Sequence, residues 1–169
     1  MNILNVRVDD RLVHGTVATQ WIPRLQIQRA ICIDDESANN PMMKSALRLA
    51  TPKAVFLSAI TLDKAIENLR ADKYGDERCM IVVKNPVTIL KLVENGIPID
   101  SLTLGNLGNQ KRTADSVTVS RFITINKEDY KTCETLTNKG VKLVAQMAPE
   151  DSPVENFFEE IKRKVKEEG

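Results

Sequence analysis

The chain has 169 residues, 42% of them hydrophobic and 28% charged, which is the composition of a folded domain with a real core. Its 24 Lys and Arg residues nearly balance its 23 Asp and Glu residues, and the formal net charge of +1 excludes the basic character of a typical nucleic-acid-binding domain. No apolar run approaches the ~20 residues of a membrane span. We therefore expect a cytoplasmic protein that reaches a membrane only through partners.

Strand-like and helix-like patterns alternate along the chain. Apolar runs and period-two alternation predict strands, in chain order, at residues 3–8, 29–33, 54–58, 79–83, 102–104 and 141–147. Helical spacing, with capping residues and first-turn prolines, predicts helices at 14–25, 42–50, 62–69, between 85 and 96, at 127–139 and after 153. The segment 117–125 alternates weakly and is compatible with one strand or two.

This order of elements predicts the fold class. Strands that alternate with helices of about 10–15 residues favour an α/β domain with an open, mainly parallel twisted sheet flanked by helices on both faces. The continuous apolar run 79–83 is typical of a central strand buried on both faces. The chain has no repeat and no linker, so we expect one domain over 1–169. Cys32 and Cys79 lie in apolar runs, where buried reduced thiols are expected.

Charged groups crowd the junction between the first strand and the first helix. The residues concerned are Arg7, Asp9, Asp10, Arg11 and His14, the only histidine of the chain, followed by Gly15. In an α/β sheet this junction lies at the carboxyl ends of the strands, where ligands bind. Free N–H groups at a helix start attract an anion, and arginine offers a planar fork that suits phosphate oxygens. Arg7, Arg11 and Gly15 are therefore candidate phosphate-binding or transition-state residues.

His14 is the candidate nucleophile of this site. A neutral imidazole can take a phosphoryl group, and a carboxylate that accepts from one ring N–H orients the other nitrogen for attack. Asp9 or Asp10 can do this, and the sequence does not decide between them. A histidine near a helix start is also a common capping or surface residue. A metal site of His14, Asp9 and Asp10, as in a metal-assisted hydrolase, is another alternative, which two adjacent arginines disfavour. No nucleotide-binding glycine motif is present, and the Gly105–Gly108 loop is too short a pattern to count as one.

The stretch Arg7-Val8-Asp9-Asp10-Arg11-Leu12-Val13-His14-Gly15 resembles the signature of the IIB component of the mannose/fructose/sorbose family of the sugar phosphotransferase system (PTS). The resemblance covers nearly the whole chain. Further segments similar to that family are Asp34-Asp35-Glu36, Lys73-Tyr74-Gly75-Asp76, Lys84-Asn85-Pro86 and Gln146-Met147-Ala148-Pro149.

The resemblance implies a phosphocarrier of the type protein-Nπ-phosphohistidine–sugar phosphotransferase, working without a cofactor or a metal. His14 matches the histidine that takes a phosphoryl group on Nδ1 from the IIA component. The group then passes to a sugar held by the membrane IIC and IID components, so the protein is peripheral to the membrane through its partners. A non-catalytic regulatory version of the fold is the alternative. The transported sugar and a homodimeric state stay open.

Overall fold

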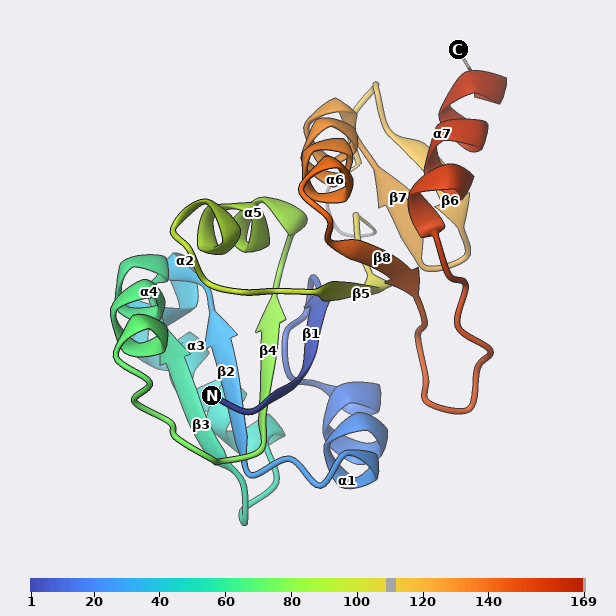
Figure 1. The fold of residues 1–169 in the computed structure, drawn as a ribbon. Helices are drawn as coiled ribbons and strands as arrows, with labels where there is room; N and C mark the ends of the chain where they lie inside the picture. Colours follow the sequence, from blue (N-terminus) through green and yellow to red (C-terminus); the bar gives the residue numbers. More distant parts are fainter. Residues whose placement is uncertain (109–111, 169) are drawn as a thin grey trace.

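The computed structural model describes residues 1–108 and 112–168. Six strands form one sheet in the order β3-β2-β4-β1-β5-β8, and every neighbouring pair in it is parallel (Figure 1). Their bounds are β1 (Ile3–Asp9), β2 (Arg29–Ile33), β3 (Phe56–Ile60), β4 (Cys79–Val83), β5 (Ser101–Asn106) and β8 (Lys142–Ala145). A separate antiparallel hairpin joins β6 (Val117–Ser120) to β7 (Ile123–Ile125), so the segment left open by the sequence holds two strands.

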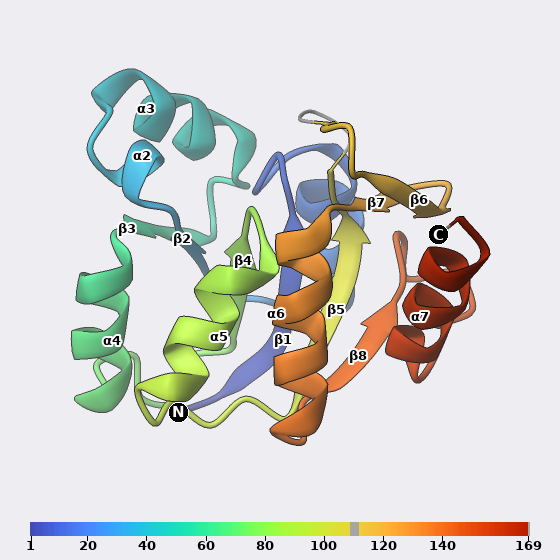
Figure 2. The same cartoon turned by 90° about the horizontal axis from the view of Figure 1, so that it is seen from above.

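Helices cover both faces of the sheet, as predicted (Figure 2). They are η1 (Val17–Trp21), α1 (Ile22–Arg24), α2 (Asp35–Ala38), α3 (Pro41–Ala50), α4 (Leu62–Arg70), α5 (Pro86–Glu94), α6 (Lys127–Asn138) and α7 (Phe157–Glu168). One hydrophobic core lies under α4, α5, α6 and α7, and the other lies under η1, α1 and α3. None of the helices in the described ranges is both long and apolar enough to cross a membrane.

The two-residue period of the strands assigns each side chain to one of the two cores. In β4, Cys79, Ile81 and Val83 belong to the first core, whereas Met80 and Val82 belong to the second. In β1, Val6 and Val8 belong to the first core, so Arg7 and Asp9 point to the face covered by η1 and α1. Two charged side chains of a central strand are thereby directed into the interior next to the first loop.

The first helix is irregular in the turn that precedes Pro23. Within the helical segment 15–24, residues Val17–Trp21 form a π-helical turn in which the Ile22 N–H donates to the Val17 carbonyl. Pro23 follows directly and has no N–H to donate, so the regular ladder of hydrogen bonds is interrupted there.

Several elements differ from the prediction in extent, and one was missed. Strand β3 begins at Phe56 rather than at residue 54, because the chain first turns after Pro52, where the Val55 N–H donates to the Pro52 carbonyl. Strand β5 continues through Asn106, so Gly105 is part of a strand and not of a loop. The short helix α2 was missed; Asp34 caps it by accepting from the Ser37 N–H.

Burial of the three cysteines predicts that none of them reacts in the folded protein. Cys32, Cys79 and Cys133 are free thiols, and burial raises their pKa to about 12, about 11 and about 12. We expect no reaction with a thiol reagent at pH 8 in native protein and complete reaction of all three in denaturant. Rapid modification of any one thiol under native conditions would contradict its placement in the core.

Candidate functional site

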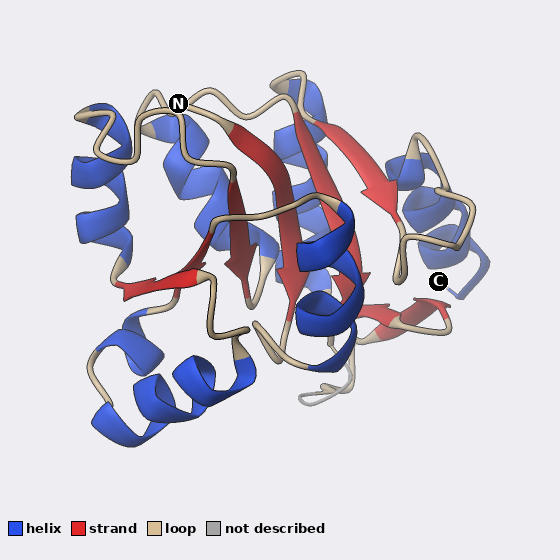
Figure 3. Ribbon diagram, turned by 90° about the horizontal axis from the view of Figure 1, so that it is seen from below, coloured by secondary structure: helices blue, strands red, loops and turns tan. Residues whose placement is uncertain are grey.

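The charged loop after β1 lies at the carboxyl edge of the sheet, where its strands end. Figure 3 shows the parallel strands side by side with the loops that follow them. In the strand order, the chain leaves β1 toward β2, in the direction of the β3 edge. The chain leaves β5, the neighbour of β1, toward β8 at the opposite edge. Neighbouring strands with diverging connections leave a crevice between them, which is the usual ligand position in this type of sheet.

Buried apolar residues hold the loop in place. Leu12 and Val13 lie in the second core. Leu12 has a φ of 60°, a left-handed backbone conformation that residues other than glycine rarely adopt. The Leu12 N–H donates to the Asp9 carbonyl at 2.8 Å, and the Asp10 N–H donates to the Asn106 carbonyl at 3.0 Å. The loop is therefore a tight turn that is anchored to the second core and to the end of β5.

The structure brings Asp9, and not Asp10, to the histidine. His14 Nε2 lies 2.9 Å from Asp9 Oδ2, within hydrogen-bond distance but without the alignment of a formed hydrogen bond. The other Asp9 oxygen, Oδ1, accepts from the Arg11 N–H at 3.0 Å. The Asp9 side chain is 1% exposed and that of His14 is 19% exposed. The carboxylate therefore faces Nε2, and Nδ1 is the nitrogen that does not meet it.

Arg11 and Gly15 lie on the outside of the same turn. Both residues are exposed, and a Cβ built on Gly15 would meet no atom within 4 Å. The His14 carbonyl accepts from the Ala18 N–H at 3.0 Å, so the N–H groups of residues 15–17 precede the first regular helical bond. The site thus combines an imidazole, a guanidinium, open space and a helix start, which together suit a tetrahedral anion.

Arg7 is not on this surface, and its predicted direct contact with phosphate does not fit its position. Its side chain is 0% exposed, and Nη2 donates to the carbonyls of Gln146 at 3.0 Å and Met147 at 3.3 Å. The guanidinium carbon lies 4.5 Å from the centre of the Trp21 ring. The sequence pattern placed Arg7 beside the loop correctly but could not show that its side chain turns inward.

Both glycines of the Gly105–Gly108 stretch lie where a side chain would clash with a neighbouring group. A Cβ on Gly105 would lie 2.1 Å from Arg7 Nη2, and a Cβ on Gly108, whose φ is +78°, would lie 1.9 Å from the Thr124 carbonyl oxygen. Both positions exclude a side chain because another group is already there. Residue 109, which follows this stretch, lies outside the described residues.

A second group of charges borders the loop. Lys84 Nζ, at the end of β4, lies 2.9 Å from Asp34 Oδ2 and 3.5 Å from Glu36 Oε2, which joins the ends of β4 and β2. Asp10 and Lys84 line a cavity of about 460 Å³ together with Asn85, which caps α5. Sequence reasoning did not pair Lys84 with Asp34 or Glu36, because no single motif contains both partners of the ion pair.

A metal site of the kind considered above needs at least three ligand side chains that face one point. Over residues 1–108 and 112–168, no group of three His, Cys, Asp or Glu side chains is placed to hold a metal ion. The geometry therefore gives the hydrolase alternative no support of its own.

Comparisons of the sequence and of the structure with known proteins point to the same family. The family described as PTS system sorbose subfamily IIB component matches residues 3–168. The chain belongs to this family. The fructose-specific EIIB component of Bacillus subtilis is 30% identical over 166 residues, covering 98% of this chain and 99% of that protein. The IIBSor domain of the Klebsiella pneumoniae sorbose permease superposes with a TM-score of 0.88 at 28% identity, covering 96% of this chain and 98% of that one.

Membership of the family establishes the general activity. The chain is a IIB component of a sugar phosphotransferase system, and such components act in phosphoryl transfer together with IIA and with membrane IIC and IID components. The mannose-specific EIIAB component of Escherichia coli is 29% identical over 145 residues, which cover 86% of this chain but only 44% of that protein. In that relative, a unit like this chain is one part of a longer EIIAB polypeptide.

The ion pair beside the loop predicts a stability change in acid. Burial raises the pKa of Asp34, but hydrogen bonds from Ser37 and Lys84 outweigh it and leave the pKa below its usual value of 3.8. A depressed carboxylate pKa stabilises the fold above the unfolded pKa, and this stability is lost as the pH falls through the folded pKa. Asp34→Asn should therefore lower the free energy of unfolding at pH 7, and the difference from wild type should shrink below about pH 4.

Urea unfolding at pH 7 and pH 3 measures this difference. Asp76→Asn, a change at an exposed aspartate, is the control and should alter stability little at either pH. An equal loss at both pH values for Asp34→Asn would show that the carboxylate charge does not contribute.

Proposed function

We propose that His14 is the phosphoryl acceptor of this IIB component. In this proposal, Nδ1 takes the phosphoryl group from a phosphohistidine of IIA and passes it to a sugar held by IIC and IID. The observation that carries the proposal is the 2.9 Å separation of His14 Nε2 from the buried carboxylate of Asp9. A proton on Nε2 is favoured by that carboxylate, so the lone pair is on Nδ1.

The chemistry needs only two displacements. In the first, the Nδ1 lone pair attacks phosphorus and the P–N bond to the IIA histidine breaks, while the Nε2 proton stays in place opposite Asp9. In the second, a sugar hydroxyl oxygen attacks phosphorus, the P–N bond to His14 breaks, and the hydroxyl proton leaves to a base. Arg11 and the N–H groups from Gly15 onward stabilise the negative charge on the transferring oxygens in both steps.

The remaining site residues have supporting roles in this proposal. Asp9 orients the imidazole, and Asp10 fixes the loop through its backbone bond to Asn106. Gly15 leaves the approach to the phosphoryl group open. The donor is a IIA protein or domain, as the joined EIIAB relative suggests, and neither a metal nor a cofactor takes part.

Removal of the imidazole tests the acceptor. His14→Ala should still fold, because the side chain is partly exposed and belongs to neither hydrophobic core, and should accept no phosphate. Incubation with phosphorylated IIA, followed by intact mass and acid treatment, measures the phosphate and its acid lability. A regulatory version without turnover would leave the wild type unmodified, and acid-labile phosphate on the variant would refute the assignment to His14.

Arg11→Ala tests the anion contact. A guanidinium that stabilises the transferring group acts in the transition state, so we expect transfer to slow by about 10²–10³-fold with little change in stability. Arg11→Lys should recover part of the rate because it keeps the charge but not the fork. The control is Arg24→Ala, which removes an exposed arginine at the end of the helical segment that follows the loop. Equal rates for the two alanine variants would show that Arg11 is only a surface charge.

A further inference from the structure

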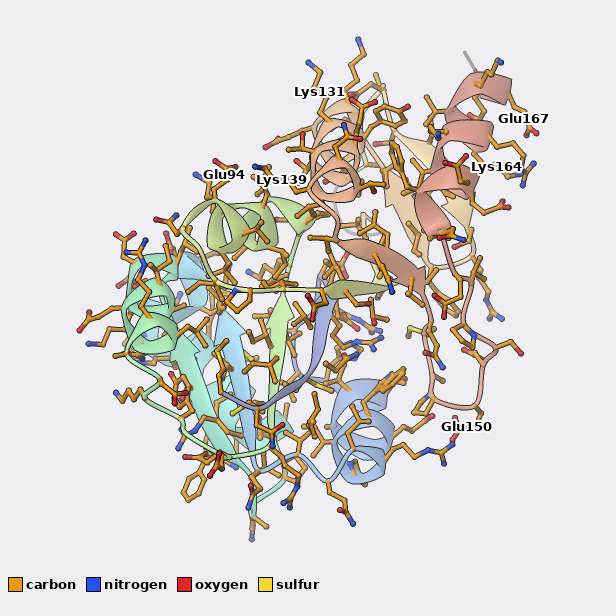
Figure 4. The ribbon with its side chains drawn as sticks, viewed as in Figure 1. Glu94, Lys131, Lys139, Glu150, Lys164 and Glu167 are labelled. Carbon is orange, nitrogen blue, oxygen red and sulfur yellow. The ribbon has the colours of Figure 1, made fainter. Side chains whose placement is uncertain are left out.

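Arg7 and Asp9 differ from the other charged side chains of the described residues because they are enclosed. Figure 4 shows Glu94 on α5, Lys131 on α6 and Lys139 just after α6 projecting away from the fold, as solvated charges normally do. Arg7 is 0% exposed in the middle of the sheet. A buried charge is unfavourable unless other groups compensate it, so its retention at this place calls for a function.

The contacts of Arg7 compensate its charge only in part. Nη2 donates to two backbone carbonyls, and the Trp21 ring lies against the guanidinium, but these are neutral partners. Among the described residues, Arg7 Nε and Nη1 have no hydrogen-bond partner. Burial lowers the pKa of Arg7 to about 10, and the charge of Asp9 raises it in opposition. At neutral pH the Arg7 guanidinium is therefore still a cation, and Asp9 is the carboxylate whose charge interacts with it.

Asp9 and Arg7 are placed to act on each other. They are two residues apart on β1 and point to the same face, and both side chains are buried. Electrostatic interactions between groups in such a low-dielectric interior are stronger than in water. Asp9 in turn lies against His14 Nε2, and the side chain of His14 is partly exposed.

We propose that Arg7 is a positioning residue of the phosphoryl site, whose positive charge compensates the buried carboxylate of Asp9 and thereby keeps the imidazole proton of His14 on Nε2. This inference rests on the proposed function, because it concerns which nitrogen of His14 is free to react. Arg7 does not touch the phosphoryl group. It acts through Asp9, as an outer carboxylate partner acts through the histidine it orients.

The chain offers a way to disturb Arg7 without removing its charge. In Gly105→Ala the new Cβ would lie 2.1 Å from Nη2, so the guanidinium has to move. Trp21→Phe is the matched control: it removes the Nε1–H that donates to the Met147 carbonyl at 2.8 Å but keeps an aromatic ring under the guanidinium. Arg7→Met removes the charge, and Arg7→Lys restores it on a similar stem.

The experiment measures the tautomer of the single histidine by ¹⁵N NMR, together with the rate of phosphorylation by phospho-IIA. In wild type, Nε2 should carry the proton. Arg7→Met and Gly105→Ala should shift protons to Nδ1 and slow phosphorylation by about 10–100-fold, whereas Arg7→Lys and Trp21→Phe should keep the wild-type tautomer. If Arg7→Met does not fold, Gly105→Ala against Trp21→Phe decides the same question.

The outcomes separate the two proposals. If wild type accepts phosphate but both Arg7→Met and Gly105→Ala keep the Nε2 proton, Arg7 only supports the fold and the inference is wrong, even if the melting temperature falls. If wild type accepts no phosphate at His14, the proposed function fails, whatever the tautomer.

Discussion

The site depends on one electrostatic constraint, which is that two opposite charges are buried on a central strand. Arg7 and Asp9 occupy the polar face of β1, whose other face carries Val6 and Val8 into the larger core. A strand at the edge of the sheet could leave these charges in water. In the middle of the sheet they must be compensated within the protein, and the backbone carbonyls of residues 146 and 147, the ring of Trp21 and the space at Gly105 serve this end.

The groups that compensate the charge of Arg7 also connect distant parts of the chain to the loop. Met147 follows the last strand of the sheet, yet its carbonyl accepts from both Arg7 and Trp21, and Trp21 belongs to the helix that begins just after His14. The loop is thus held from three directions, namely by β1, by the first helix and by the segment after β8. Such support explains how Leu12 is kept at a φ of 60°, a conformation that persists only where the surroundings fix it.

The fold was largely predictable because its signals are local. Period-two strands, helical spacing and Asn or Thr caps such as Asn40, Asn85 and Asn126 each lie within a few residues of sequence. The choice between Asp9 and Asp10 was not predictable, since successive residues of a strand face opposite sides and the turn geometry decides which carboxylate reaches the ring. The inward direction of Arg7 depends on Gly105 and Met147, which are about a hundred residues or more away along the chain.

The division between buried and exposed groups suits the proposed role, in which one nitrogen of His14 serves two partners. In that role the donor and the sugar complex approach the same face of His14 in turn, so the site has to be open to both. Asp9 and Arg7, which we propose to orient the imidazole, are buried where no partner can displace them, while Arg11 and Gly15 are exposed. In this proposal a partner supplies only the phosphoryl group or its acceptor, because the orientation of the imidazole is already fixed before either binds.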